Sequence, residues 1–275
     1  MKLIFLDIDG TLIDYDLTVP ESARVAINET IKKGNKVYLC TGCSKGEVEN
    51  RNLGVNVNGM IGANGGYIES DGKVIMHKCF KLEDIIHFVD WCNKREMPFN
   101  LECNDGIYIN KEHMDKRRVA MYQYVHGKGS YPKEDDEVLS DPSWKYGELY
   151  RSDVNKVDFV LNSYQDHLDS IEEFKNYYAS TWGGKGEDAI FGDLSIKGVS
   201  KATSIEILLK ELNVDKSDAY GFGDAKVDIP MFEVCGTSVA MGNGSEECKK
   251  AASYVTDTVK NDGLYKAFKH FGLID

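Results

Sequence analysis

The sequence lacks a long hydrophobic run and is short of basic residues. No apolar stretch approaches the roughly 20 residues that a membrane-spanning helix requires, and the chain enters an apolar segment at once, without a secretory signal pattern. Lysine and arginine number 33, against 45 aspartates and glutamates, for a formal net charge of -12. This acidic excess argues against nucleic acid or a membrane as a partner. We therefore expect a cytoplasmic protein in which any phosphate site is locally basic.

A disulfide framework is also missing. The seven cysteines are an odd number and are scattered along the chain, as is typical of reduced thiols. Only Cys40 and Cys43 form a C-x-x-C pair, and no second pair completes a zinc site. The pair raises one regulatory hypothesis, in which an oxidative disulfide between Cys40 and Cys43 constrains the loop between them and stops activity.

Two carboxylates follow the first apolar run of the chain. Residues 3–6 have the composition of a short buried strand, and Asp7 and Asp9 come directly after it. In an open parallel α/β sheet, ligands bind in the crevice beyond the carboxyl ends of the strands. Neighbouring carboxylates resist joint ionisation unless a positive charge joins them. The sequence therefore predicts a divalent cation at this point.

Alternating strand and helix patterns predict an α/β fold, with a Rossmann-like parallel sheet and helices on both faces. A helix follows the apparent capping box that starts at Thr18, and another starts at an N-cap, Ser200. The middle of the chain has a different, α+β texture. We expect a discontinuous core and an inserted cap domain, with the core at 1–80 and 190–275 and the cap at 81–189.

Polar groups at the predicted strand ends and helix starts converge on one crevice. They are Asp7 with Asp9, Thr41, Lys201, and Asp224 with Asp228. Together they supply a nucleophile, an acid or base, a hydroxyl with backbone N–H donors, a cation and metal-binding carboxylates. This set suits phosphoryl transfer through a covalent aspartyl intermediate, which depends on positioned oxygens and compensating positive charge.

Four motifs in this order resemble those of the haloacid dehalogenase (HAD) superfamily: FLDIDGTL, CTG, GVSK and GFGDAKVDIPMF. The chain length, the late GVSKATSIEILLKEL and the tail that begins MGNGSEECKK resemble the Cof-type phosphatases, which have a large α/β cap inserted after the third strand. The resemblance covers 1–80 and 190–275 and is faint in the segment between them. It implies a phosphatase whose cap sets specificity.

The resemblance implies roles for the four acidic residues. Asp7 would attack phosphorus, and Asp9 would protonate the leaving oxygen and then activate water. Asp7, the backbone carbonyl of Asp9, and Asp224 would bind Mg²⁺, with Asp228 in support. Magnesium prefers carboxylate and phosphate oxygens of this kind.

The resemblance also implies a phosphate-binding set. The backbone at Ile8, the hydroxyl of Thr41 with the Gly42 amide, and Lys201 would hold the phosphate. Lys197 is close in the sequence, but Lys201 is the residue that matches the GVSK pattern.

Two positions depart from the family pattern. Cys43 stands where arginine is usual, and Val227 stands where asparagine is usual. That asparagine commonly helps to hold the phosphate, so its absence removes a polar contact of about 1–3 kcal/mol unless another group replaces it. Asn64 and Asn243 lie in glycine-rich turns, and two interpretations stay open for them: they supply left-handed backbone geometry, or they border the phosphate site.

These features predict a Mg²⁺-dependent phosphomonoesterase that acts on small phosphorylated metabolites, with sugar phosphates as the expected class. Two alternatives stay open: a phosphomutase, and a non-catalytic sugar-phosphate-binding protein, for which Cys43 and Val227 argue. A pure binding protein gains nothing from a nucleophile next to an acid, and this alternative is opposed by the presence together of Asp7, Asp9, Lys201, Asp224 and Asp228. No heptad pattern or apolar interface motif indicates an oligomeric state.

Overall fold

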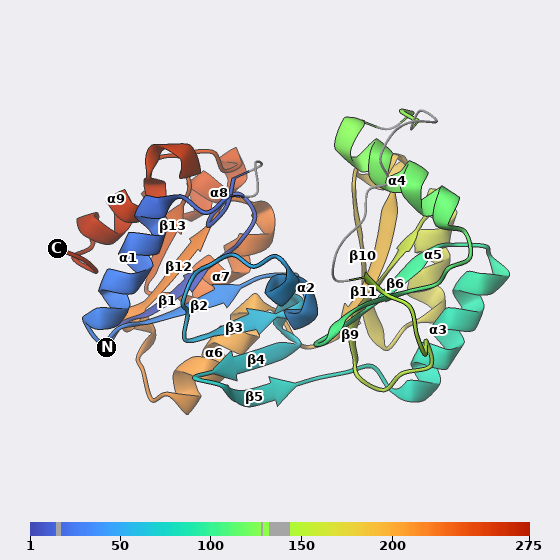
Figure 1. Cartoon of the computed structure of the whole chain (residues 1–275), viewed down its shortest axis with the longest axis horizontal. Coiled ribbons are helices and arrows are strands. Elements are labelled where there is room, and N and C mark those ends of the chain that lie inside the picture. Colours follow the sequence, from blue (N-terminus) through green and yellow to red (C-terminus); the bar gives the residue numbers. More distant parts are fainter. Residues whose placement is uncertain (15–17, 128, 132–143) are drawn as a thin grey trace. The chain divides into compact units, whose positions relative to one another are not determined.

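The structure is a computed structural model that describes residues 1–14, 18–127, 129–131 and 144–275. The chain divides into two compact units, which are described separately (Figure 1). Unit 1 comprises Met1–Cys43, Asn52–His77 and Gly198–Asp275, and unit 2 comprises Ser44–Arg51 and Lys78–Lys197. Among the described residues, no helix combines the length and the apolar character needed to cross a membrane.

Unit 1 is built on a sheet whose described strands have the order β14-β13-β12-β1-β2-β3-β4-β5. The strands are β1 (Leu3–Leu6), β2 (Lys36–Cys40), β3 (Gly59–Gly62), β4 (Tyr67–Ser70), β5 (Lys73–His77), β12 (Ala219–Gly223), β13 (Thr237–Ala240) and β14 (Tyr254–Val255). The strands from β14 to β3 are parallel. The sheet continues into β4 and β5 as an antiparallel hairpin.

Helices cover both faces of this sheet (Figure 1). They are α1 (Glu21–Lys32), α6 (Lys201–Glu211), α7 (Ile229–Val234), α8 (Glu246–Ala251) and α9 (Gly263–His270). Phe5 of β1 belongs to the same buried cluster as Leu208 of α6. Phe222 of β12 contacts Phe268 of α9, with ring centroids 5.2 Å apart. The central strands are therefore buried on both faces, as apolar parallel strands require, and the predicted α/β fold class is confirmed.

Local sequence sets the start of α6 but not that of α1. The side chain of Ser200 accepts a hydrogen bond from the backbone N–H of Thr203 at 3.2 Å, and Thr203 Oγ1 accepts one from the N–H of Ser200 at 2.9 Å. The predicted N-cap at Ser200 is therefore confirmed. The capping box predicted at Thr18 is wrong. Helix α1 begins at Glu21, and its N-cap residue is Pro20, which has a φ of -58° and makes no side-chain capping bond.

Unit 2 contains a second sheet, whose described strands have the order β10-β11-β9-β6-β7-β8. The strands are β6 (Phe99–Cys103), β7 (Gly106–Ile109), β8 (Trp144–Lys145), β9 (Val154–Val160), β10 (Tyr177–Trp182) and β11 (Phe191–Ile196). The helices are α2 (Lys45–Asn50), α3 (Leu82–Lys94), α4 (Met114–His126) and α5 (Tyr164–Glu173). The core includes an aromatic cluster in which Phe88 of α3 contacts Phe99 and Phe159.

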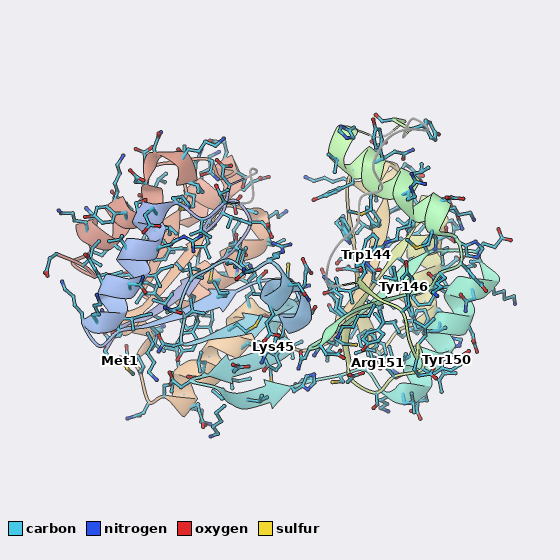
Figure 2. The ribbon with its side chains drawn as sticks, viewed as in Figure 1. Met1, Lys45, Trp144, Tyr146, Tyr150 and Arg151 are labelled. Carbon is cyan, nitrogen blue, oxygen red and sulfur yellow. The ribbon has the colours of Figure 1, made fainter. Side chains whose placement is uncertain are left out.

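Buried polar side chains alternate with this apolar core along β6 and β9. Asn100 Nδ2 donates to both carboxylate oxygens of Asp158, at 3.0 and 2.9 Å. Lys156 Nζ lies 2.8 Å from Glu102 Oε1. Buried polar groups are costly without such partners. Trp144, labelled in Figure 2, belongs to the short edge strand β8 of this sheet.

The division into units differs in three places from the boundaries expected from the sequence, the smallest being residues 78–80, which belong to unit 2 rather than to the core. Residues 190–197 continue unit 2, because β11 pairs antiparallel with β9 and β10. Residues 44–51 also belong to unit 2. The backbone of Gly46 in α2 lies so close to β7 that a Cβ on this glycine would be 2.2 Å from the nitrogen of Gly106. Local sequence pattern does not encode a contact between segments 60 residues apart.

Candidate active site

The ends of β1 and β12 place three carboxylates together in unit 1. Asp7 follows β1, Asp224 follows β12, and Asp228 ends a short 3-10 turn at Lys226–Asp228. The two strands are neighbours in the sheet, and the N–H of Asp7 donates to the carbonyl of Phe222 at 3.0 Å. One oxygen from each carboxylate lies within 4.8 Å of the other two. The sequence placed these acids at one sheet edge, and the structure brings them together there.

Lys201 brings the positive charge to this cluster. Its Nζ lies 2.6 Å from Asp7 Oδ1 and 2.6 Å from Asp228 Oδ1, and its side chain is buried. Burial alone would lower the pKa of Lys201, but the two carboxylates raise it above its ordinary value. The ammonium is therefore protonated at neutral pH. Lys197 belongs to unit 2, where its Nζ donates to the backbone carbonyl of Lys175.

Burial has the largest effect on the pKa values of Asp7 and Asp224. It raises the pKa of Asp7 to about 7, with Lys201 opposing this effect and Asp228 adding to it. It also raises the pKa of Asp224 to about 6. Both carboxylates therefore require a nearby positive charge to be ionised at little cost, and a cation that binds them competes with protons.

Both oxygens of Asp228 already accept hydrogen bonds from the protein. Oδ1 accepts from Lys201, and Oδ2 accepts from the backbone N–H groups of Asp224 and Ala225, each at 3.1 Å. The side chain is completely buried. Asp228 thus positions Lys201 and the Asp224 loop, which leaves Asp7 and Asp224 as the better-placed metal ligands.

The turn after β1 orients Asp224. The backbone N–H groups of Leu12 and Ile13 donate to the carbonyl of Ile8 at 2.9 and 3.0 Å. Gly10 has a φ of +80°, and a Cβ at this position would lie 2.4 Å from Asp224 Oδ2. Thr11 Oγ1 donates to Asp224 Oδ1 at 3.3 Å. Sequence reasoning assigned no role to Gly10 or Thr11, although both lie in the D-G-T motif that marked the site.

Asp9 lies outside the carboxylate cluster. Its side chain is exposed, and its backbone forms an isolated bridge with Ile13. Exposure suits a group that exchanges protons with a leaving oxygen and with water. The role expected for the Asp9 carbonyl as a metal ligand stays a prediction.

The loop after β2 starts at the same edge of the sheet, because β2 is the neighbour of β1 on the other side. Thr41 donates its N–H to the carbonyl of Ile61 at 2.9 Å, and Thr41 Oγ1 accepts the N–H of Cys43 at 3.2 Å. Cys40 and Cys43 are not joined by a disulfide, and burial raises the pKa of Cys40 to about 12. A thiolate is therefore scarce at Cys40, and the disulfide hypothesis stays a prediction.

Two residues noted in the sequence have clear structural settings. Asn243 connects two turns of unit 1. Its Nδ2 donates to the carbonyl of Gly10 at 2.7 Å, and its Oδ1 accepts the N–H of Val259 at 3.0 Å. Val227 is 70% exposed and offers only an apolar side chain.

The donor set of this cluster fits magnesium, which prefers hard carboxylate oxygens. A second group of possible metal ligands among the described residues, Cys103 with Asp105 and Asp153, lies in unit 2. Arg151 pairs with both carboxylates of that group, at 2.6 Å from Asp153 and 3.5 Å from Asp105, and burial raises the pKa of the Cys103 thiol to about 12, so the group lacks a thiolate ligand. The cluster around Asp7 is therefore the better candidate for a metal centre.

Comparison with known proteins finds relatives that match nearly the whole chain. The chain is 28% identical over 278 residues to the Bacillus subtilis (strain 168) protein named "Putative phosphatase YkrA", covering 99% of this chain and 98% of that protein. The structure of the HAD-superfamily phosphatase BT1666 from Bacteroides thetaiotaomicron matches 100% of this chain and 96% of its own, with a TM-score of 0.78 and 26% identity. The HAD subclass IIB sugar phosphatase BT4131 matches with a TM-score of 0.73, 26% identity and full coverage of both chains.

The match to a family model extends over both units. The model described as haloacid dehalogenase-like hydrolase covers residues 4–268, nearly the whole chain. This range includes the carboxylate cluster and the whole of unit 2. The family resemblance inferred from the four motifs is thereby confirmed, and the chain belongs to the haloacid dehalogenase-like hydrolases.

Proposed function

We propose that this protein is a magnesium-dependent phosphatase that hydrolyses small phosphorylated metabolites, with sugar phosphates as the substrate class. Its place among phosphoric monoester hydrolases follows from its family and from the phosphatases that it resembles. The observation that carries the proposal is the buried ammonium of Lys201, 2.6 Å from both Asp7 and Asp228 and part of the cluster that includes Asp224.

The chemistry starts at Asp7. One of its carboxylate oxygens attacks the phosphorus of the monoester, the bond to the leaving oxygen breaks, and Asp9 donates a proton to that oxygen. Asp9, now a carboxylate, takes a proton from water as the water attacks the aspartyl-phosphate. Phosphate then leaves, and the carboxylate of Asp7 and the acid form of Asp9 are restored.

Other residues hold charge and geometry during these steps. Lys201 fixes the orientation of Asp7 and offsets the charge of the phosphate. The backbone at Ile8, the hydroxyl of Thr41 and the amide of Gly42 bind phosphate oxygens. Asp7 and Asp224 would hold Mg²⁺, which would offset the negative charge of the carboxylates and the phosphate. Magnesium is the preferred metal because the candidate ligands, the carboxylates of Asp7 and Asp224 and the backbone carbonyl of Asp9, are all oxygen atoms.

We assign substrate specificity to unit 2, which corresponds to the expected cap domain. The sugar-phosphate class is supported by the structural match to BT4131, which is named as a sugar phosphatase. We also propose a cytoplasmic location, on the basis of the reduced cysteines and the acidic composition.

The test is phosphate release from p-nitrophenyl phosphate and a panel of sugar phosphates, with and without Mg²⁺. Asp7→Asn is compared with the wild type and with a control, Asp275→Asn, whose side chain is 97% exposed. Metal-dependent release that disappears only in Asp7→Asn supports the proposal. If the folded wild type releases no phosphate, activity that depends on a bisphosphate indicates a mutase, and sugar-phosphate binding without turnover indicates a binding protein.

A further inference from the structure

The 3-10 turn at Ala63–Gly65 has an uncommon backbone. Ala63 and Asn64 have φ values of +51° and +53°, a left-handed conformation that non-glycine residues seldom adopt. Strained backbone of this kind persists only where the surrounding structure fixes it, and it clusters at ligand sites. The turn therefore raises the question of what holds it and what it presents.

Two elements of unit 1 hold the turn. The N–H of Ala63 donates to the carbonyl of Cys43 at 2.8 Å, which ties the turn to the Thr41–Cys43 loop. The buried hydroxyl of Ser204 in α6 donates to the carbonyl of Gly65 at 2.8 Å. A Cβ on Gly65 would lie 2.4 Å from the carbonyl oxygen of Ser200, so the turn packs directly against the start of α6. The turn thus lies between the two elements that carry the expected phosphate ligands.

The side chain of Asn64 lies against Gly42 of the Thr41–Cys43 loop. A Cβ built on Gly42 would be 2.9 Å from Asn64 Oδ1, so only glycine fits opposite this amide without displacing it. Asn64 is half-buried, and its amide makes no hydrogen bond to any other described residue. Asn243 differs in this respect, because both ends of its amide are used by the protein.

The geometry points to Asn64 as a phosphate-binding residue, whose Nδ2 N–H groups donate to an oxygen of the substrate phosphate beside Gly42. An amide donor on a phosphate oxygen is charge-assisted and strong, and the turn holds the backbone of Asn64 in place before substrate arrives. Val227, 70% exposed and apolar, offers no such donor. This inference rests on the proposed function, and it adds a ligand that the motifs did not supply.

Two substitutions test the assignment without loss of the turn. Asn64→Gly removes the amide and accepts a positive φ with ease, so the variant is expected to unfold at or above the wild-type temperature. Asn64→Asp keeps a residue that tolerates this conformation and places a negative charge against the phosphate. The matched control is Asn213→Gly, because Asn213 also has a positive φ, of +51°, and is exposed beyond the end of α6.

The primary measurement is the dissociation constant of inorganic phosphate in the presence of Mg²⁺, by titration calorimetry. We expect it to rise about tenfold in Asn64→Gly and further in Asn64→Asp, and to stay unchanged in Asn213→Gly. With p-nitrophenyl phosphate, KM is expected to rise more than kcat falls. A residue that merely shaped the turn would lower thermal stability and kcat instead.

A phosphate dissociation constant within twofold of the wild type in Asn64→Gly would overturn the assignment, as would a wild type that binds no inorganic phosphate. Failure of the proposed function gives a different result. In that case the wild type binds phosphate but hydrolyses no ester, and the phosphate affinities of the two Asn64 variants still decide the role of Asn64.

Discussion

The Nζ of Lys201 lies 2.6 Å from Oδ1 of Asp7, although 194 positions separate the two residues in the chain. The same ammonium lies 2.6 Å from Asp228 Oδ1. Three charged groups in a buried site therefore depend on one another, since removing one member of a buried ion pair leaves an uncompensated charge.

Lys201→Met is expected to lower the free energy of unfolding by about 3 kcal/mol, because Asp7 and Asp228 then face each other without a cation. Added Mg²⁺ should stabilise this variant more than the wild type, since it supplies the missing charge. Urea unfolding with and without the metal measures both effects. The control is Lys197→Met, which removes an exposed lysine four positions earlier and should change stability by less than about 0.5 kcal/mol. Equal losses in the two variants would contradict the buried network.

The affinity for Mg²⁺ should rise with pH. Protons compete with the metal for Asp7, whose pKa burial raises to about 7, and for Asp224, whose pKa burial raises to about 6. Binding should therefore be weak near pH 5, strengthen between pH 6 and 7, and level off above that range. Calorimetric titration of Mg²⁺ across this range, with Asp7→Asn for comparison, checks the sign. A wild-type affinity that is independent of pH would contradict these raised pKa values.

Gly10→Ala is expected to destabilise the fold more than Gly72→Ala, although both glycines have nearly the same φ. The values are +80° and +76°, so each substitution carries a similar backbone penalty of about 1 kcal/mol. A Cβ at Gly10 would meet Asp224 Oδ2 at 2.4 Å, whereas one at Gly72 would meet nothing within 4 Å. Gly10→Ala should therefore also lose phosphatase activity, while Gly72→Ala should keep it. Thermal unfolding and phosphate release on both variants separate strain from displacement of Asp224.

Glu102 in unit 2 should make stability depend on pH. Burial raises its pKa to about 7, with the neighbouring Lys156 opposing this effect. The folded state then holds a proton that the unfolded state releases at lower pH, so stability falls as pH rises from about 4.5 to about 7. Relative to Glu102→Gln, the wild type should lose up to about 3 kcal/mol across this window. Urea unfolding of both proteins at pH 5 and pH 8 measures the difference, and identical pH profiles would rule the effect out.

The residues at the strand ends of the site could be predicted because short local sequence patterns mark them. An apolar run that stops at Asp7, and a capping pattern at Ser200 directly before Lys201, each place one residue at the edge of a parallel sheet. Once the fold class is known, these edges meet. The order of strands β12, β1 and β2 then brings Asp224, Asp7 and Thr41 to the same edge.

Contacts between turns that are far apart in the chain could not be predicted from local sequence patterns. Asn243 joins Gly10 and Val259, and Thr11 reaches Asp224, but no short pattern records which turn another turn touches. The segment 44–51 follows β2 directly, yet it belongs to unit 2. For α1, the sequence pattern predicted an N-cap at Thr18, but the helix starts after Pro20, whose ring fixes φ.

The position of β1 between β2 and β12 also decides when the reaction centre can form. Leu3 pairs with Lys36 on one side and with Ala219 on the other. As the chain leaves the ribosome, all of unit 2 emerges before β12, so unit 2 can complete its own sheet first. Lys201, Asp224 and Asp228 are all synthesised after unit 2, so the cluster around Asp7 is incomplete until Asp228 has emerged. A nascent or truncated chain that ends before Asp228 is therefore expected to lack phosphatase activity even when unit 2 is already folded.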